Sequence, residues 1–155
     1  FTPAEEVLKD DPDGIMLSNG PGDPAENKEI IAIVRDLLGK KPLFGICLGH
    51  QLTALATGGK TVKLKYGHRG GNQPVKDLES GRTVITSQNH GYAVDGASLK
   101  AGKVSHINVN DNTCEGVAYP ELDAQTVQFH PEACAGPKDM EGLFEQFIRR
   151  MTEDK

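Results

Sequence analysis

A cysteine between two glycines is the residue best suited to act as a nucleophile. Residues 45–49 read Gly-Ile-Cys-Leu-Gly, so a glycine lies two positions before and two positions after Cys47. This spacing is typical of a sharp strand-to-helix turn that exposes a reactive side chain, because bulkier flanking residues would collide. A helix N-terminus beneath the sulfur favours the thiolate, and the N–H of Leu48 would face a developing oxyanion. The alternative is a buried cysteine that only fills space.

A histidine and a glutamate near the C-terminal end could supply the base that such a cysteine needs. His130 and Glu132 flank Pro131 at the end of the last apolar run. Residues i and i+2 of an extended segment point to the same side, so Glu132 can orient the His130 imidazole. A base oriented by a carboxylate activates a cysteine nucleophile. We therefore predict a triad of Cys47, His130 and Glu132, against the alternative of a surface histidine in a turn.

A loop rich in glycine and proline is a third candidate for the site. Residues 19–24 read Asn-Gly-Pro-Gly-Asp-Pro. Two glycines held by two prolines let backbone N–H groups approach a ligand closely. A phosphate-binding loop is disfavoured because the P-loop lysine pattern is absent and because Pro21 and Pro24 lack an N–H group. A plain turn is the remaining alternative.

Apolar runs and helical periodicity in the first third of the chain predict the elements that position Cys47. Strands are expected over residues 14–17 and 42–46. Each is followed by a helical pattern, over residues 30–38 and 48–56, and glycines at positions 39, 58 and 59 favour helix ends. Because strand and helix alternate, we predict a parallel sheet with right-handed crossovers.

The second half of the chain has short β-prone runs separated by turn residues. These runs are Thr61–Leu64, Thr83–Thr86, Tyr92–Val94, Val104–Val109, Gly116–Ala118 and Thr126–Phe129. An amphipathic helix is expected over residues 143–151. We predict one domain over residues 1–155: an α/β fold with a mainly parallel central sheet flanked by helices and a smaller antiparallel segment.

Composition disfavours several classes of function. The 17 basic and 22 acidic residues give a net charge of −5 with no basic run, which disfavours nucleic-acid binding. No apolar stretch approaches the roughly 20 residues that span a bilayer, so no membrane association is expected. The three cysteines, at 47, 114 and 134, make no disulfide framework and favour a reducing cytoplasm. Without C-x-x-C or H-E-x-x-H spacing, no metal site is predicted.

Four segments together resemble the class I glutamine amidotransferase family. They are Asn19–Pro24, Gly45–Gln51, Ser87–Tyr92 and His130–Glu132. Within that family, the set is most similar to the glutaminase subunit of carbamoyl-phosphate synthetases. The resemblance covers residues 10–151 of the chain and implies the α/β fold of the family.

The resemblance implies a role for each matching residue. Cys47 would be the nucleophile, His130 the general base and then the acid, and Glu132 the group that orients His130. The backbone N–H groups of Gly20 and Leu48 would form an oxyanion hole. The residues implied to contact substrate are Gly20, Gly22, Leu48, Gln51, Asn89, Gly91 and Tyr92.

The same resemblance implies the substrate and the partner. Glutamine would be hydrolysed, and its ammonia would pass to a large synthetase subunit that makes carbamoyl phosphate. ATP and metal ions are expected only in that subunit, because no ATP-binding signature occurs here. The alternatives are a glutaminase domain of another biosynthetic pathway and a non-catalytic module that only binds the partner.

One part of the family's fold has no counterpart in the sequence. The glutaminase subunits that the sequence resembles carry a separate N-terminal domain, and their amidotransferase domain begins with a strand and a helix ahead of the segment that resembles the region of Asp13. We therefore expect the sheet to lack this first strand, and its edge to be covered by another chain or disordered.

The remaining histidines, Cys114 and Cys134 are assigned no chemistry from the sequence. His50 is expected to support the helix predicted over residues 48–56, and Cys114 and Cys134 are expected to pack in the interior or lie at the surface. His68 and His106 lie in polar strand edges and are expected to be solvated. His90 lies in the segment implied to hold substrate and is left without a role.

Overall fold

The computed structural model describes residues 4–17, 23–129, 145, 147–149 and 151. Its helices are α1 (Ala4–Lys9), α2 (Lys28–Leu37) and α3 (Leu48–Ala56), with 3-10 turns at Pro24–Glu26, Gly96–Ser98 and Pro120–Leu122. Its strands are β1 (Ile15–Leu17), β2 (Leu43–Ile46), β3 (Lys60–Asp77), β4 (Thr83–Asp95), β5 (Lys103–Asn108), β6 (Cys114–Tyr119) and β7 (Ala124–Val127).

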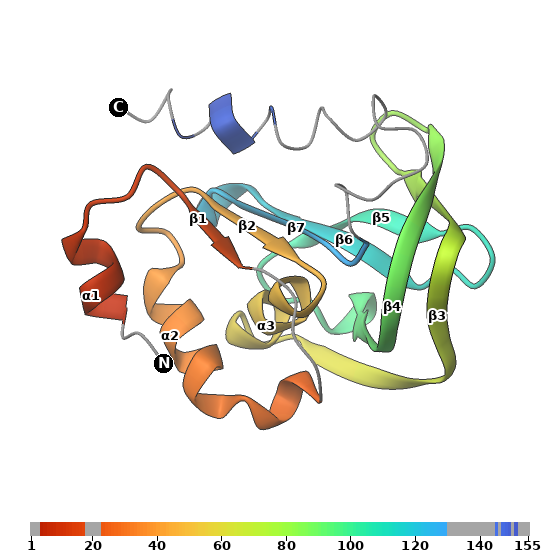
Figure 1. Ribbon diagram of the computed structural model, residues 1–155, viewed down its shortest axis with the longest axis horizontal. Helices are drawn as coiled ribbons and strands as arrows, with labels where there is room; N and C mark the ends of the chain where they lie inside the picture. Colours follow the sequence, from red (N-terminus) through yellow and green to blue (C-terminus); the bar gives the residue numbers. More distant parts are fainter. Residues whose placement is uncertain (1–3, 18–22, 130–144, 146, 150, 152–155) are drawn as a thin grey trace.

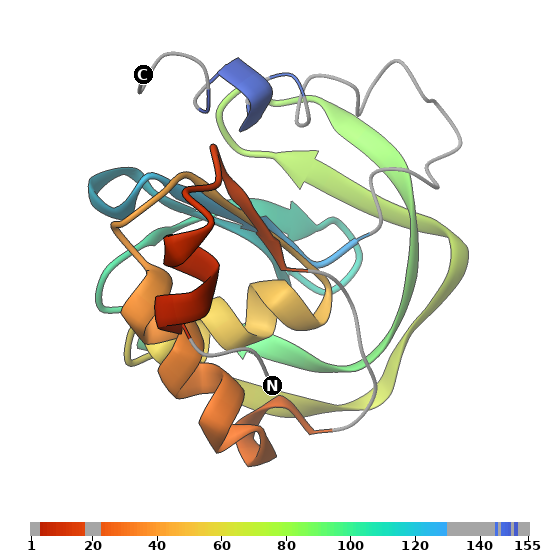
Figure 2. The ribbon, with the colours of Figure 1, turned by 60° about the vertical axis from the view of Figure 1, so that its left-hand side comes forward.

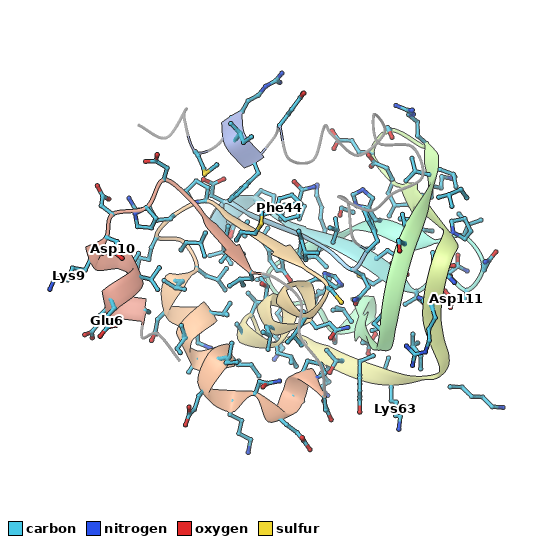
Figure 3. All side chains as sticks on the ribbon, viewed as in Figure 1. Glu6, Lys9, Asp10, Phe44, Lys63 and Asp111 are labelled. Atoms are coloured by element: carbon cyan, nitrogen blue, oxygen red, sulfur yellow. The ribbon has the colours of Figure 1, made fainter. Side chains whose placement is uncertain are left out.

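These strands form one sheet in the order β1-β2-β7-β6-β4-β3-β5. The helices α1, α2 and α3 lie on one face of this sheet, and the described helical residues near the C-terminus lie on the other (Figure 1, Figure 2). Phe44 of β2 lies on the face opposite α2 and α3, and its ring packs edge-on against Phe147 at 5.6 Å (Figure 3). Strand β2 is therefore covered on both faces.

Three parallel strands hold the turn formed by residues 45–49, which is called the elbow below. β2 lies between β1 and β7 and pairs in parallel with both, with Gly45 opposite Leu17 on one side and Thr126 on the other. All four residues of β2 are buried, which explains why its sequence is an unbroken apolar run rather than an alternating one. The predicted strands and helices of this part are confirmed.

The rest of the sheet is antiparallel, and here one expectation was wrong. The α/β fold is confirmed. Among the described strands, however, only β1–β2 and β2–β7 pair in parallel, whereas β3, β4, β5 and β6 pair antiparallel and β6 joins antiparallel to β7. The antiparallel part is therefore larger than the parallel part. The reason is that residues 60–77 and 83–95 each continue as one long strand through polar and glycine residues.

Backbone hydrogen bonds between β3 and β4 keep both strands continuous through their polar and glycine residues. Two register shifts, between Lys63 and His68 and between Gly70 and Gln73, absorb the interruptions. Gly67 and Gly70 adopt positive φ angles of 71° and 99°, which glycine allows at little cost. Hydropathy reports the burial of side chains, not this backbone pairing, so the sequence indicated only fragments of these strands.

Strand β1 is the edge of the described sheet. It pairs with β2 alone, and residues 4–9 form helix α1 rather than a further strand. What covers this edge stays a prediction. Of the described residues, none forms a helix that is long and apolar enough to cross a membrane.

Candidate active site

Cys47 occupies the strained turn between β2 and α3. It is the N-cap residue of α3, with φ 55° and ψ −107°. A non-glycine residue rarely adopts positive φ, and such strain persists only where the surroundings enforce it. The N–H of Cys47 donates to the carbonyl of Val127 at 2.9 Å, which ties the turn to the end of β7. The predicted sharp strand-to-helix turn is confirmed, whereas the role of Cys47 as a nucleophile stays a prediction.

The two flanking glycines are required by close backbone contacts. A Cβ atom on Gly49 would overlap the carbonyl oxygen of Leu17, at the end of β1. A Cβ atom on Gly45 would lie 2.8 Å from the carbonyl carbon of Gly49 and 2.9 Å from Cγ2 of Thr126. The elbow is therefore compressed between β1 and β7, and this compression explains the glycine spacing in the sequence.

Two glutamines connect the sulfur of Cys47 to strand β4. Nε2 of Gln128 donates to Sγ of Cys47 at 3.6 Å. Nε2 of Gln51, one helical turn after Cys47, donates to Oε1 of Gln128 and to the backbone carbonyl of Tyr92, each at 2.8 Å. The structure thus brings together three of the predicted site residues, Cys47, Gln51 and Tyr92.

Gln128 is a site residue that the sequence reasoning missed. It lies two positions before His130, just after β7. The i, i+2 argument that joined His130 to Glu132 applies equally in the other direction, so this signal was present in the sequence.

The predicted substrate segment lies in β4. Tyr92 contacts Gln51 through its backbone carbonyl, so this contact does not depend on the aromatic side chain. Gly91 has open space where a Cβ would stand, with only the Arg69 guanidinium at 3.8 Å. Asn89 pairs with Arg69 across the β3–β4 ladder, and its side chain lies outside the described part of the structure. Leu48 is the first residue of α3, immediately after Cys47.

The other predicted site residues lie outside the described residues. These are Gly20, Gly22, His130 and Glu132. The last described residues before these two segments are Leu17, which ends β1 against Gly49, and the buried Phe129, which follows Gln128. The roles of these four residues therefore stay predictions.

His50 supports the fold, as expected from the sequence. It is fully buried in α3, and its Nδ1 lies 2.7 Å from Oγ1 of Thr126. Burial, together with the nearby His90 and His106, lowers the pKa of His50 to about 3. The imidazole is therefore neutral at pH 7 and acts as a tie between α3 and β7.

The expectation that His68 and His106 are solvated was wrong. They are 6% and 4% exposed. His106 packs edge-on against Phe129 at 5.7 Å, and burial lowers its pKa. The polar sequence around His68 concealed its burial because its partners His90 and Glu115 are polar side chains on other strands. His106 is covered by the Phe129 ring, which is distant in sequence, while its hydrogen-bond partner is the neighbouring Ser105.

His68 and His90 share a buried cluster with Glu115. A hydrogen bond with Glu115, aided by one with Asp111, outweighs burial and raises the pKa of His68 to about 9. Burial is the largest effect on His90 and lowers its pKa to about 4, although the Tyr92 carbonyl opposes it. Cys114 is also buried, which raises the pKa of its thiol to about 12 and confirms its assignment to packing.

The chain belongs to the class I glutamine amidotransferase family. The sequence model of that family, described as "Glutamine amidotransferase class-I", matches residues 1–150. Among its curated relatives are the proteins named carbamoyl phosphate synthase small chain in Fusobacterium nucleatum and Bacillus cereus, which are 56% and 57% identical over 155 and 156 residues. Each match covers 99% of this chain and 43% of the relative, so the chain spans less than half of their length.

A solved structure shares the fold at lower identity. A Thermoplasma acidophilum protein, provisionally described as part of a GMP synthase, matches with a TM-score of 0.79 and 22% identity. The match covers 97% of this chain and 77% of that protein. At this identity the likeness concerns the fold alone, and it agrees with the α/β architecture described above.

Proposed function

We propose that this chain hydrolyses the side-chain amide of glutamine to glutamate and ammonia, with Cys47 as the nucleophile. The observation that carries the proposal is the positive-φ turn at Cys47, held between Gly45 and Gly49 against β1 and β7. This geometry places one side chain, which is 6% exposed, at the carboxyl end of the parallel strands, where ligands bind in α/β sheets. Membership of the amidotransferase family supports the same chemistry.

In this proposal the reaction runs through a thioester. His130 takes the proton of Cys47, and the sulfur attacks the amide carbon of glutamine. The N–H groups of Leu48 and Gly20 stabilise the negative oxygen, and His130 returns a proton to the departing ammonia. Water, deprotonated by His130, then hydrolyses the thioester to glutamate, while Glu132 keeps the imidazole oriented.

The second part of the proposal concerns the fate of the ammonia. Relatives with 56–57% identity are named carbamoyl phosphate synthase small chain, and we infer that this chain serves the same synthesis. A large synthetase subunit would receive the ammonia and would bind ATP and its metal ions. Both subunits would act in the cytoplasm. There are two alternatives: a glutaminase domain of another pathway, and a module that binds the partner without turnover.

Glutamine-dependent ammonia release tests the first part. The chain, with and without the large subunit, should release ammonia, and Cys47→Ser should reduce the rate at least about 10³-fold because the nucleophile is lost. Cys114→Ser is the matched control and should retain the activity, since its buried thiol has a raised pKa. A well-folded protein with no release under either condition supports the binding module instead.

Labelling with a glutamine analogue carrying a diazo-ketone locates the nucleophile. Peptide mapping should find the label on Cys47. Label on Cys114 or Cys134 contradicts the site. Carbamoyl phosphate formation on addition of the large synthetase subunit, glutamine, bicarbonate and ATP tests the partner; ammonia release without that product favours another pathway.

A further inference from the structure

Three buried side chains from three strands point one ligand atom each at a common centre. They are His68 of β3, His90 of β4 and Glu115 of β6, and their ligand atoms all lie within 4.8 Å of one another. Nδ1 of His68 lies 3.2 Å from Nε2 of His90 and 3.1 Å from Oε1 of Glu115. Ligand atoms around a tetrahedral zinc ion, bound at about 2.0–2.2 Å, lie about 3.3–3.6 Å apart. Two of the three separations are therefore close to those of a metal site.

The outer nitrogens of both imidazoles are anchored to oxygen atoms. Nε2 of His68 lies 2.7 Å from Oδ2 of Asp111, and Nδ1 of His90 lies 2.6 Å from the carbonyl of Tyr92. With protons on these outer nitrogens, the inner nitrogens present lone pairs to the centre. A carboxylate or backbone carbonyl that holds the outer N–H is the arrangement found behind metal-binding histidines.

The cluster has more acceptors than protons. Four oxygen atoms face the imidazole nitrogens. Three belong to Asp111, Tyr92 and Glu115, and the fourth is Oε1 of Gln88, which lies 2.7 Å from Nε2 of His90. The Gln88 side chain presents its oxygen to His90 because its amide nitrogen donates to Thr86. Two neutral imidazoles carry only two N–H groups for these four contacts. If one imidazole is protonated, the pair carries three N–H groups, and one of the four contacts still lacks a hydrogen.

Glu115 adds a second and independent sign that a partner is missing from the cluster. It is fully buried, and among the described residues its Oε2 atom has no hydrogen-bond partner. A buried carboxylate oxygen without a partner is costly, and a bound water or ion relieves that cost. A divalent cation at the centre would face the two inner nitrogens and the oxygens of Glu115 and Gln88, and would leave both outer N–H groups to donate as they do.

We propose that His68, His90 and Glu115 form a binding site for one divalent transition-metal ion of the Zn²⁺ type, with Gln88 as an additional oxygen ligand. The ligand set of two imidazoles and a carboxylate suits zinc, whereas Mg²⁺ and Ca²⁺ prefer oxygen alone. Asp111, whose side chain is 45% exposed and lies beside β3, marks the route from solvent (Figure 3). This site would revise the expectation that the chain itself binds no metal, and its ligands come from strands too far apart in sequence for a spacing motif.

The site also lies next to the candidate active site. The Tyr92 carbonyl accepts from both His90 and Gln51, so an ion held by His90 would order the part of β4 that contacts Gln51. The proposal itself does not depend on glutamine hydrolysis, because metal binding is measured directly.

Zinc titration of the chain in a Cys47→Ser background tests the site without a contribution from that thiol. Competition with a chromogenic chelator should give one Zn²⁺ per chain, and Glu115→Gln and His68→Gln should each weaken binding at least about 10-fold. Glu121→Gln, at an exposed glutamate, is the matched control and should bind as the parent does. Circular dichroism and thermal unfolding report whether each variant is folded.

Each outcome supports or overturns the site. No zinc binding by the parent, or equal binding by the parent and the folded Glu115→Gln variant, overturns it; the cluster is then held by protons alone. Replacement with Co²⁺ should give a spectrum without thiolate charge transfer, and a thiolate band places the ion on a cysteine instead. If Glu115→Gln and His68→Gln fail to fold, Asp111→Asn, at a partly exposed position, should still weaken binding about 10-fold, and unchanged affinity overturns the site.

Discussion

At the scale of the residue, the backbone conformation of Cys47 determines where its sulfur lies. Its positive φ costs of order 1–3 kcal/mol, which the pairing of β2 with its two neighbours must offset. The side chain is thereby turned out of the strand and placed at the start of α3. The two flanking glycines permit this turn by removing the atoms that would collide with Leu17 and Thr126.

Gly49→Ala should therefore destabilise the protein. The added Cβ would overlap the carbonyl oxygen of Leu17, and we expect a loss of about 1–3 kcal/mol in the free energy of unfolding. Gly71→Ala is the matched control, because among the described residues no atom beyond its two chain neighbours lies within 4 Å of its Cβ position. It should change stability by at most about 0.5 kcal/mol. Urea denaturation measures both, and equal stabilities of the two variants would contradict the tight elbow.

Gln128 should influence the reactivity of the sulfur if the proposed function is correct. Gln128→Leu removes the donor to Sγ and the acceptor of Gln51, and a hydrogen bond to a charged group is worth about 1.5–3 kcal/mol. We expect kcat for glutamine hydrolysis to fall about 10- to 100-fold. Gln125→Leu, at a partly exposed position in β7, is the control. Steady-state kinetics compare them, and an unchanged kcat in the Gln128 variant argues against this role.

At the scale of the element, the parallel strands decide where the site forms. β2 ends at Cys47, while β1 ends at Leu17 and β7 at Val127, both in contact with the elbow. Since the carboxyl ends of parallel strands meet at one edge of the sheet, residues that follow them converge there. Helix α3 is held against β7 by His50 and Thr126, so the helix that begins at the nucleophile cannot shift without breaking this tie.

The buried, neutral His50 should lower the free energy of unfolding of the protein as the pH becomes acidic. The folded state keeps His50 neutral down to about pH 3, whereas the unfolded chain takes up this proton near pH 6.5. The unfolded state therefore binds more protons in this window, and the free energy of unfolding falls as the pH drops from 6.5 toward 3, by at most about 1.4 kcal/mol per pH unit from this group.

Denaturation of the parent and of His50→Gln at pH 7, 5.5 and 4.5 isolates this contribution. The contributions of the other ionisable groups are common to both proteins, so the difference between the two slopes belongs to position 50. The variant should lose stability less steeply with falling pH. Parallel slopes would falsify the assignment of a buried neutral imidazole.

At the scale of the whole molecule, the described sheet has an open edge at β1. β2 has paired neighbours on both sides, whereas β1 is an edge strand in the described sheet and Met16, in its middle, is 48% exposed. An unpaired edge beside an exposed apolar side chain is a surface where another strand can add. This is the edge at which the family's first strand is expected.

Hydrogen–deuterium exchange should reveal the difference between the two strands. In the chain alone, we expect the amides of β1 to exchange faster than those of β2, because β1 has one hydrogen-bonded neighbour and β2 has two. Addition of a protein segment that supplies the neighbouring strand should slow exchange in β1 and leave β2 unchanged. Equal protection of β1 and β2 in the chain alone would contradict an open edge.

The local features of the site could be predicted from the sequence because their causes are local. The Gly-x-Cys-x-Gly spacing is a steric requirement of one turn, and the apolar run before it together with the helical pattern after it indicates the strand and the helix that form that turn. The i, i+2 rule that joined His130 to Glu132 could likewise have indicated Gln128.

Contacts between distant segments could be decided only in three dimensions. His68 meets Glu115 across 47 positions of the chain, and Gln128 meets Cys47 across 81, so no window of sequence contains either pair. Strands β3 and β4 likewise continue through polar residues because each supplies the other's backbone partners. Hydropathy distinguishes apolar from polar residues, but a polar group is buried when its partners are present, and those partners are assembled by the fold.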